Sequence, residues 1–98
     1  MKLFLVHCGF YDPALGDAVF ENHTNFFVAA EDHIGARDKA KAQTVFKDRR
    51  MHIDGIQQIE CVDGFEIHLE EKHAGSSETV VHSFTFRELA RKPSSSGE

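Results

Sequence analysis

Hydrophobic residues alternate along the start of the chain, at the even positions Phe4, Val6, Cys8 and Phe10. This period of two is typical of a β-strand, because successive side chains point to opposite faces. The odd positions begin with Leu3 and Leu5, so the strand is apolar on both faces over its first half. A strand of this kind is usually covered on both sides, and we therefore expect a central strand over residues 2–10.

A second strand is predicted over residues 19–30, which are rich in Phe and Val. Polar residues interrupt its hydrophobic pattern at 22–25, where we expect a bend or a β-bulge. Turn-forming residues at 11–13 and 16–17 place a loop between the first two strands.

A helix is predicted over Asp32–Gln43, because its first residue is a favourable N-cap. Ala36 and Ala40 are four residues apart and share one face of this helix. Such small side chains let a helix lie close to a sheet. Val45 and Phe46 are expected to form a short second turn that closes one end of the core.

The second half of the chain predicts three further strands, over 52–62, 65–69 and about 80–86. Asp63-Gly64 separates the first two of these, and this dipeptide is a strong signal for a tight hairpin turn. Residues 93–98 are polar and small, and we expect a disordered C-terminal tail there.

These elements predict an α+β fold of order β-β-α-β-β-β, with one helix packed on a mostly antiparallel sheet of four or five strands. At 98 residues the chain is long enough for one core, and we expect a single domain over 1–92. The predicted core comprises Phe4, Val6, Val28, Ile53, Ile59, Phe65, Ile67 and Leu69.

Composition narrows the class of protein. The chain is 41% hydrophobic, carries a net charge of −5 and has no apolar run long enough for a membrane span. Its length excludes the large dehydrogenase, kinase and barrel enzymes. Cys8 and Cys61 are far apart and form no CxxC motif, so we expect buried free thiols in a cytoplasmic protein.

Positive charge is concentrated in residues 37–50, which hold six of the eleven Lys and Arg residues. The segment fits either a solvated helix face or a surface that binds phosphate or nucleic acid. No RNA-recognition motif, zinc-finger spacing or Gly-rich phosphate loop accompanies it. We therefore favour the solvated face and do not expect nucleic-acid binding.

The seven histidines raise the question of a metal site. His52 and Asp54 share one strand face because they are two residues apart, and so do Glu21 and His23. His7 and His68 also face away from their apolar neighbours. Divalent metals favour such His and carboxylate sets.

The candidate polar site is therefore Glu21, His23, His52 and Asp54, with His23, His52 and Asp54 as the candidate metal ligands. Two alternatives remain open. Strand alternation alone places polar residues opposite a buried face, and a pair such as His52 with Asp54 also suits acid/base catalysis. No catalytic residue is assigned, and no cofactor is implied beyond a possible divalent metal.

Several stretches together resemble a known family. They are Leu3-Phe4-Leu5-Val6 leading to Gly9, Glu21-Asn22-His23, Phe27-Val28-Ala29, His52-Ile53-Asp54-Gly55 and Val62-Asp63-Gly64-Phe65-Glu66-Ile67. In this order they resemble the prokaryotic domain of unknown function numbered 1543. The resemblance implies a small bacterial protein with no activity to carry over, and it marks Glu21, His23, His52 and Asp54 as the matching polar motif positions.

We expect a cytoplasmic binding or structural module rather than an enzyme, with metal-dependent or acid/base chemistry as the alternative. Leu3, Leu5, Phe27 and Ala29 are in phase with the sheet face that a single helix leaves uncovered. Soluble proteins usually hide such patches, so we expect a homodimer. The competing expectation is that Phe84 and Phe86 fold back over that face. The sequence identifies no small-molecule ligand.

Overall fold

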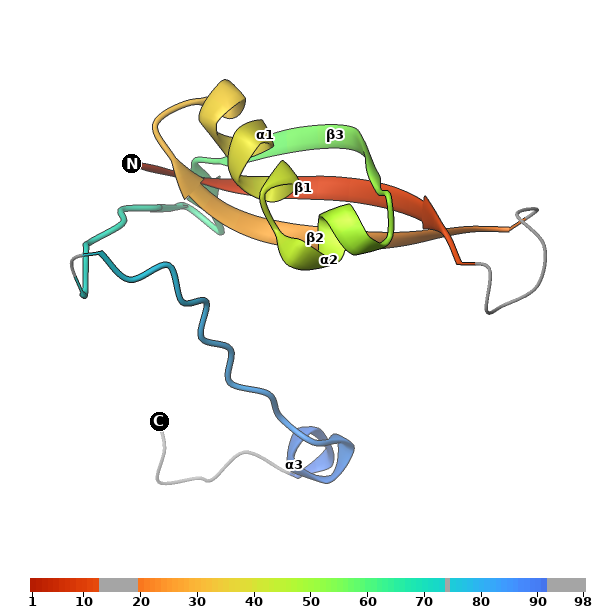
Figure 1. Ribbon diagram of the computed structural model, residues 1–98. Coiled ribbons are helices and arrows are strands. Elements are labelled where there is room, and N and C mark those ends of the chain that lie inside the picture. Colours follow the sequence, from red (N-terminus) through yellow and green to blue (C-terminus); the bar gives the residue numbers. More distant parts are fainter. Residues whose placement is uncertain (13–19, 74, 92–98) are drawn as a thin grey trace.

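Strand β1 (Lys2–Tyr11) lies at the centre of an antiparallel sheet (Figure 1). It pairs with β2 (Glu21–Ala30) on one side and with β3 (His52–Ile59) on the other, which gives the order β2-β1-β3. The structure, a computed structural model, describes residues 1–12, 20–73 and 75–91. The central position predicted for the first strand is confirmed, but among the described residues helices cover only one of its two faces (Figure 1).

Helix α1 (His33–Lys41) begins where the sequence predicts. The Asp32 carboxylate accepts a hydrogen bond from the Gly35 backbone N–H at 2.8 Å, which caps the first turn. Ala36 and Ala40 are fully buried, so the face of small residues packs directly on the sheet, as expected.

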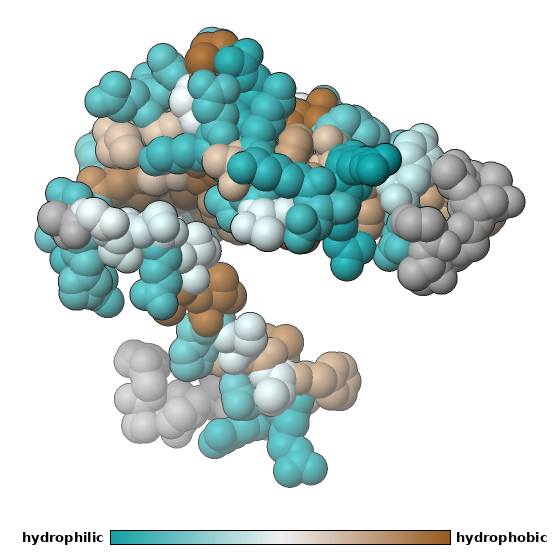
Figure 2. Space-filling view, in the orientation of Figure 1, coloured by the Kyte–Doolittle hydropathy of each residue, from teal (hydrophilic) through white to brown (hydrophobic). Residues whose placement is uncertain are grey.

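The second helix, α2 (Thr44–Asp48), completes this layer. Phe46 is buried and packs with Met51 in the core, so the predicted closing turn is confirmed. Both helices cover the same face of the sheet (Figure 1) and present a mostly hydrophilic surface outward (Figure 2). The core lies between these helices and the sheet. It comprises Phe4, Val6, Cys8, Val28, Ala30, Ala36, Ala40, Phe46 and Met51.

The sheet contains a β-bulge, but on β3 and not on β2, where the sequence predicted it. Pairing of β2 with β1 is continuous, without the bulge expected at 22–25. The register shifts instead on β3, where Gly55 pairs with His7 and Ile53 pairs with Cys8, so Asp54 is an extra residue. The predicted strand over 52–62 therefore bulges at Asp54, and β3 ends at Ile59.

The predicted Asp-Gly turn forms between β4 (Cys61–Val62) and β5 (Phe65–Glu66). Asp63 has φ of 52° and Gly64 has φ of 86°, as a tight hairpin turn requires. These short strands make a separate two-stranded sheet, so within the described residues there are sheets of three and two strands, not one of four or five.

The predicted core is correct for Phe4, Val6 and Val28 and wrong for its C-terminal members. Phe65 is 74% exposed and Leu69 is 40% exposed. Their alternation predicted a shared face, but in the described residues no larger sheet or helix covers that face. Ile53, Ile59 and Ile67 are half-buried, and Ile53 packs against the core with Ile56.

The fifth strand predicted near 80–86 is absent from the described residues. Residues 76–85 have no regular structure, and helix α3 (Phe86–Ala90) follows them. Thr85 accepts a hydrogen bond from the Glu88 backbone N–H at 3.2 Å, a capping interaction that favours a helix here. This segment runs away from the sheet (Figure 1) with exposed hydrophobic side chains (Figure 2), so Phe84 and Phe86 do not cover the sheet.

The α+β fold class is confirmed, although additional short helices accompany the predicted one. The predicted turn residues at 16–17 and the predicted tail at 93–98 lie outside the described residues. Among the helices in the described ranges, none is long and apolar enough to cross a membrane.

The two cysteines differ in their surroundings. Both are free thiols; Cys8 is buried as expected, whereas Cys61 is exposed, contrary to expectation. Burial raises the pKa of the Cys8 thiol above its ordinary value of 9.0, and the nearby negative charge of Asp54 adds to this shift.

We predict that burial of Phe46, rather than of Phe65, stabilises the fold. Phe46→Ala should lower the free energy of unfolding by about 3–5 kcal/mol because it opens a cavity in the core. Phe65→Ala removes an exposed side chain and should change it by no more than about 0.5 kcal/mol. Urea denaturation of both variants measures this contrast, and a larger loss from Phe65→Ala would contradict it.

We also predict unequal reactivity of the two thiols. In native protein at neutral pH, a disulfide reagent should modify Cys61 rapidly and Cys8 only after unfolding, because the thiolate is the reactive form. Because folding raises the pKa of the Cys8 thiol, the unfolded chain loses the thiol proton at a lower pH than the folded chain does. The free energy of unfolding should therefore fall as the pH rises past about 9. Cys61→Ser should abolish the rapid phase; a rapid phase that persists would contradict this assignment.

Candidate functional site

The sheet face opposite the helices, which we call the open face, is divided into two ends. Leu3 pairs with Ala29 and Ile59, and Leu5 pairs with Phe27 and Gln57, so the end near the start of β1 is mostly apolar. The other end is polar and carries the candidate residues, which lie on β2 and β3. We call these ends the apolar end and the polar end.

The polar end is centred on Gly9. This glycine pairs with His23 on β2 and with His52 on β3, so the two histidines flank it in one row. Strands two places apart in a sheet are separated by about 10 Å. Side chains from β2 and β3 therefore meet only by reaching across position 9, where no side chain stands between them.

The bulge on β3 sets the direction of the carboxylate in this cluster. Because Asp54 is the extra residue, it lies on the open face with His52, while Ile53 and Ile56 both pack against the core. Regular alternation would have placed Ile56 on the same face as His52 and Asp54. The bulge thus combines a polar face and a buried face in one short strand.

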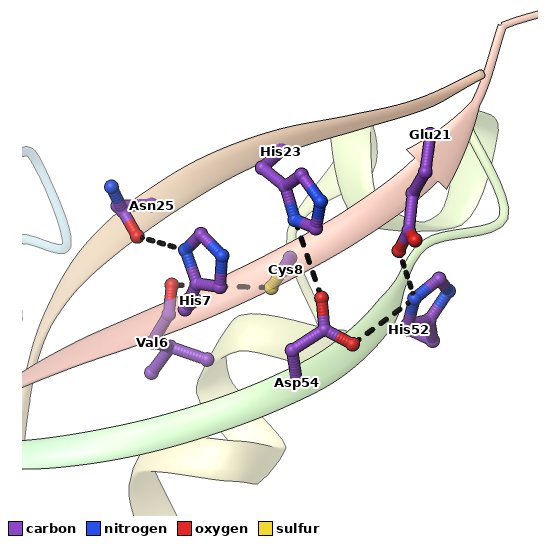
Figure 3. Close-up of polar contacts among 8 residues, drawn as sticks. All are labelled: Val6, His7, Cys8, Glu21, His23, Asn25, His52 and Asp54. Carbon is purple, nitrogen blue, oxygen red and sulfur yellow. Dashed lines mark hydrogen bonds and ion pairs between the residues drawn. The ribbon is translucent and has the colours of Figure 1, made fainter.

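Two carboxylates converge on one imidazole nitrogen (Figure 3). His52 Nε2 lies 2.6 Å from Glu21 Oε1 and 3.1 Å from Asp54 Oδ1. The side chains are about one-third to one-half exposed, so they remain accessible to a solute. Among the described residues, the ion-pair partners of Glu21 and Asp54 are histidines only, and neither carboxylate faces a permanent positive charge.

The glycine at position 9 is required by this geometry. A Cβ placed there would lie 2.0 Å from Glu21 Oε1, 2.6 Å from His52 Nε2 and 3.0 Å from Asp54 Oδ2. The first two distances are shorter than a carbon contact with these atoms allows, and the third is tight. Gly9 therefore forms the floor of the cluster, and any other residue would displace at least one candidate ligand.

A second group of side chains adjoins the first. His23 Nδ1 lies 3.3 Å from Asp54 Oδ2, and the ring of His23 stacks on that of His7 with centroids 4.9 Å apart. His7 Nδ1 lies 2.7 Å from Asn25 Oδ1. Because an amide oxygen only accepts, this nitrogen donates the hydrogen, which leaves Nε2 of His7 with a free lone pair.

A shallow depression of about 470 Å³ opens beside this second group. Its lining comprises Leu5, His7, Asn25, Asp54, Gly55, Ile56 and Gln57. A volume of this size is sufficient for a small molecule or several water molecules.

The structure connects all four candidate residues through Asp54, but it places them in two groups. Glu21 and His52 lie in one group and His23 in the other, so the metal-ligand set His23, His52 and Asp54 expected from the sequence is divided between them. It also adds His7, which alternation had placed on this face. The role of Gly9 was not predicted, because it depends on the pairing of β1 with β2 and β3. His68, considered for the same face, lies elsewhere; it is 81% exposed and pairs with Glu66 at 3.6 Å.

The basic segment lies on the helical side. Lys39 Nζ donates to the backbone carbonyl of Ala29 at the outer edge of β2. Arg49 pairs with Asp12 at 3.1 Å and lies over the Phe10 ring, 5.1 Å from its centroid. These contacts give part of the segment a structural role.

Comparison with known proteins gives a family and no activity. A family model described as Domain of Unknown Function (DUF1543) matches residues 18–69, which include β2, both helices of the core layer and β3. No curated protein and no solved structure matches the chain. The matched range contains Glu21, His23, His52 and Asp54, and it covers more than half of the chain. The chain therefore belongs to the DUF1543 family.

Proposed function

We propose that the polar end of the open face binds a divalent first-row transition metal ion, with Glu21, His52 and Asp54 as ligands. The observation that carries this proposal is the convergence of two carboxylate oxygens on one nitrogen of His52, at 2.6 and 3.1 Å. Ligands bound at about 2.1 Å to one ion lie roughly 3 Å from each other. The side chains are therefore already spaced nearly as such an ion would hold them.

The charges of the cluster support a cation at this place. Two neighbouring carboxylates repel each other, and the one imidazole that they both contact can carry at most one positive charge. A divalent cation compensates both. The mixed imidazole and carboxylate donors favour zinc, manganese, iron or nickel over magnesium, which prefers oxygen ligands and water.

The acid/base alternative uses the same His52 and Asp54. A general base needs an imidazole nitrogen directed toward a substrate. In this structure Nε2 of His52 contacts two carboxylates, so proton transfer to a substrate would have to use Nδ1. We favour metal binding because the two carboxylates and Nε2 together form a set of ligands.

A second proposal concerns self-association through the apolar end of the open face. Phe27 is 59% exposed there and pairs with Leu5, and the next row of the sheet consists of Ala29, Leu3 and Ile59. We propose that a second copy of the chain covers this patch in a two-fold symmetric homodimer, which buries the same surface on both copies.

The two free thiols support the cytoplasmic location expected from the sequence.

We predict that zinc stabilises the protein through His52. At a zinc concentration 100 times its dissociation constant, stabilisation should be about 2.7 kcal/mol. This corresponds to a rise in Tm of roughly 10 °C or more in a domain of this size. Magnesium should give little shift, and low pH should reduce the zinc shift because protons compete for the ligands. Thermal unfolding with each metal, beside metal analysis of native protein, measures this.

Two pairs of variants control this experiment. His52→Ala should abolish most of the zinc shift, whereas His33→Ala, on α1 and outside the cluster, should retain it. Gly9→Ala should weaken zinc binding at least about tenfold because its Cβ displaces ligands. Gly55→Ala is the matched control, since a Cβ there meets nothing within 4 Å. A zinc shift of full size in His52→Ala would refute the proposed ligand set.

For self-association, we predict a mass twice the 11.1 kDa of the chain at micromolar concentration. Phe27→Glu should produce the monomer because it places a charge in the apolar contact. Phe20→Glu changes an exposed Phe outside the strands and should leave the dimer intact. Light scattering across a dilution series decides the question, and a constant monomeric mass would reject the homodimer.

A further inference from the structure

The two groups of candidate ligands share one residue. Glu21, His52 and Asp54 form the first group, and His7, His23 and Asp54 form the second. Within each group the donor atoms lie within 4.8 Å of one another. Asp54 is thus the link between two potential ion positions.

The two oxygens of Asp54 are directed to different groups (Figure 3). Oδ1 lies 3.1 Å from His52 Nε2, and Oδ2 lies 3.3 Å from His23 Nδ1. A carboxylate that offers one oxygen to each side is suited to bridge two neighbouring metal ions. In enzymes such ions lie about 3.5–4 Å apart.

The second group is oriented as a ligand pair. The rings of His7 and His23 are nearly parallel, with an interplanar angle of 4°. Asn25 holds the Nδ1 side of His7 and thereby fixes the ring with its Nε2 free for coordination. Hydrogen bonds of this kind orient histidine ligands in metal sites.

We propose that the open face binds two divalent metal ions bridged by Asp54, the second held by His7, His23 and Asp54 Oδ2. This inference rests on the proposed function, because the first ion is the one held by Glu21, His52 and Asp54 Oδ1. The first group brings two negative charges to its ion, whereas the second adds two neutral imidazoles. The second ion is therefore bound more weakly, and the depression lined by His7, Asn25 and Asp54 gives solutes access to it.

Equilibrium dialysis of the full chain against zinc, followed by metal analysis, counts the bound ions. Wild-type protein should bind two equivalents in two steps of unequal affinity. His7→Ala should bind one, and Asn25→Ala should weaken the second step by about 10–100-fold. Loading with manganese should give an electron paramagnetic resonance spectrum of spin-coupled ions in wild type and of isolated ions in His7→Ala.

The number of bound ions and the variants that lose them distinguish failure of this inference from failure of the proposed function. One equivalent in wild type, lost in His52→Ala, retains the proposed function and overturns the two-ion site. No bound zinc overturns both. A second equivalent that persists in His7→Ala but disappears in His68→Ala would assign it to the exposed His68 and Glu66 pair and overturn the bridge. The Tm of each metal-free variant, compared with wild type, verifies that the fold is retained.

Discussion

The constraint on which the sheet depends is the double role of strand β1. It hydrogen-bonds to β2 and β3 along most of its length. Because side chains alternate along a strand, each residue faces either the helices or the open face. On one face Phe4, Val6 and Cys8 are buried against α1 and its neighbours. On the other, Gly9 must have no side chain, because candidate ligands occupy the space above it. A single strand thus supports the core and the polar end together.

The bulge at Asp54 allows β3 to meet both requirements. The strand supplies polar residues to one face at its start and apolar residues to the other at Ile53 and Ile56. A regular strand with this sequence would bury Asp54 with His52 or expose Ile56. The extra residue changes the phase between them, and it also directs the two oxygens of Asp54 toward different histidines.

Local signals in the sequence were sufficient to predict β1 and the start and packing face of α1. Alternation in β1, the Asp32 N-cap and the small face of Ala36 and Ala40 each reflect interactions within a few residues. The failures involve partners distant in the chain. Alternation at Phe65 did not show that no larger sheet covers it within the described part of the chain. The spacing of Thr85 and Glu88 competed with a hydrophobic strand pattern.

The sequence predicted which candidate residues share a face of the sheet. It did not predict which of their side chains meet. Residues two apart place Glu21 with His23 and His52 with Asp54. Their meeting across Gly9 depends on the register of two strand pairs, and no single segment encodes that register. His7 was recognisable on the same face, although its orientation by Asn25 required the pairing of β1 with β2.

The strand order has a consequence for how the molecule folds. β1 and β2 follow each other in the chain and form a hairpin, whereas β3 joins only after both helices have been traversed. Closing so long a loop is slower than forming the hairpin because of its entropic cost. Gly9 therefore pairs with His52 on β3 late in folding. The cluster of His52, Glu21 and Asp54 forms only once β3 has joined the sheet. Contacts within this cluster would report completion of the sheet in a kinetic experiment.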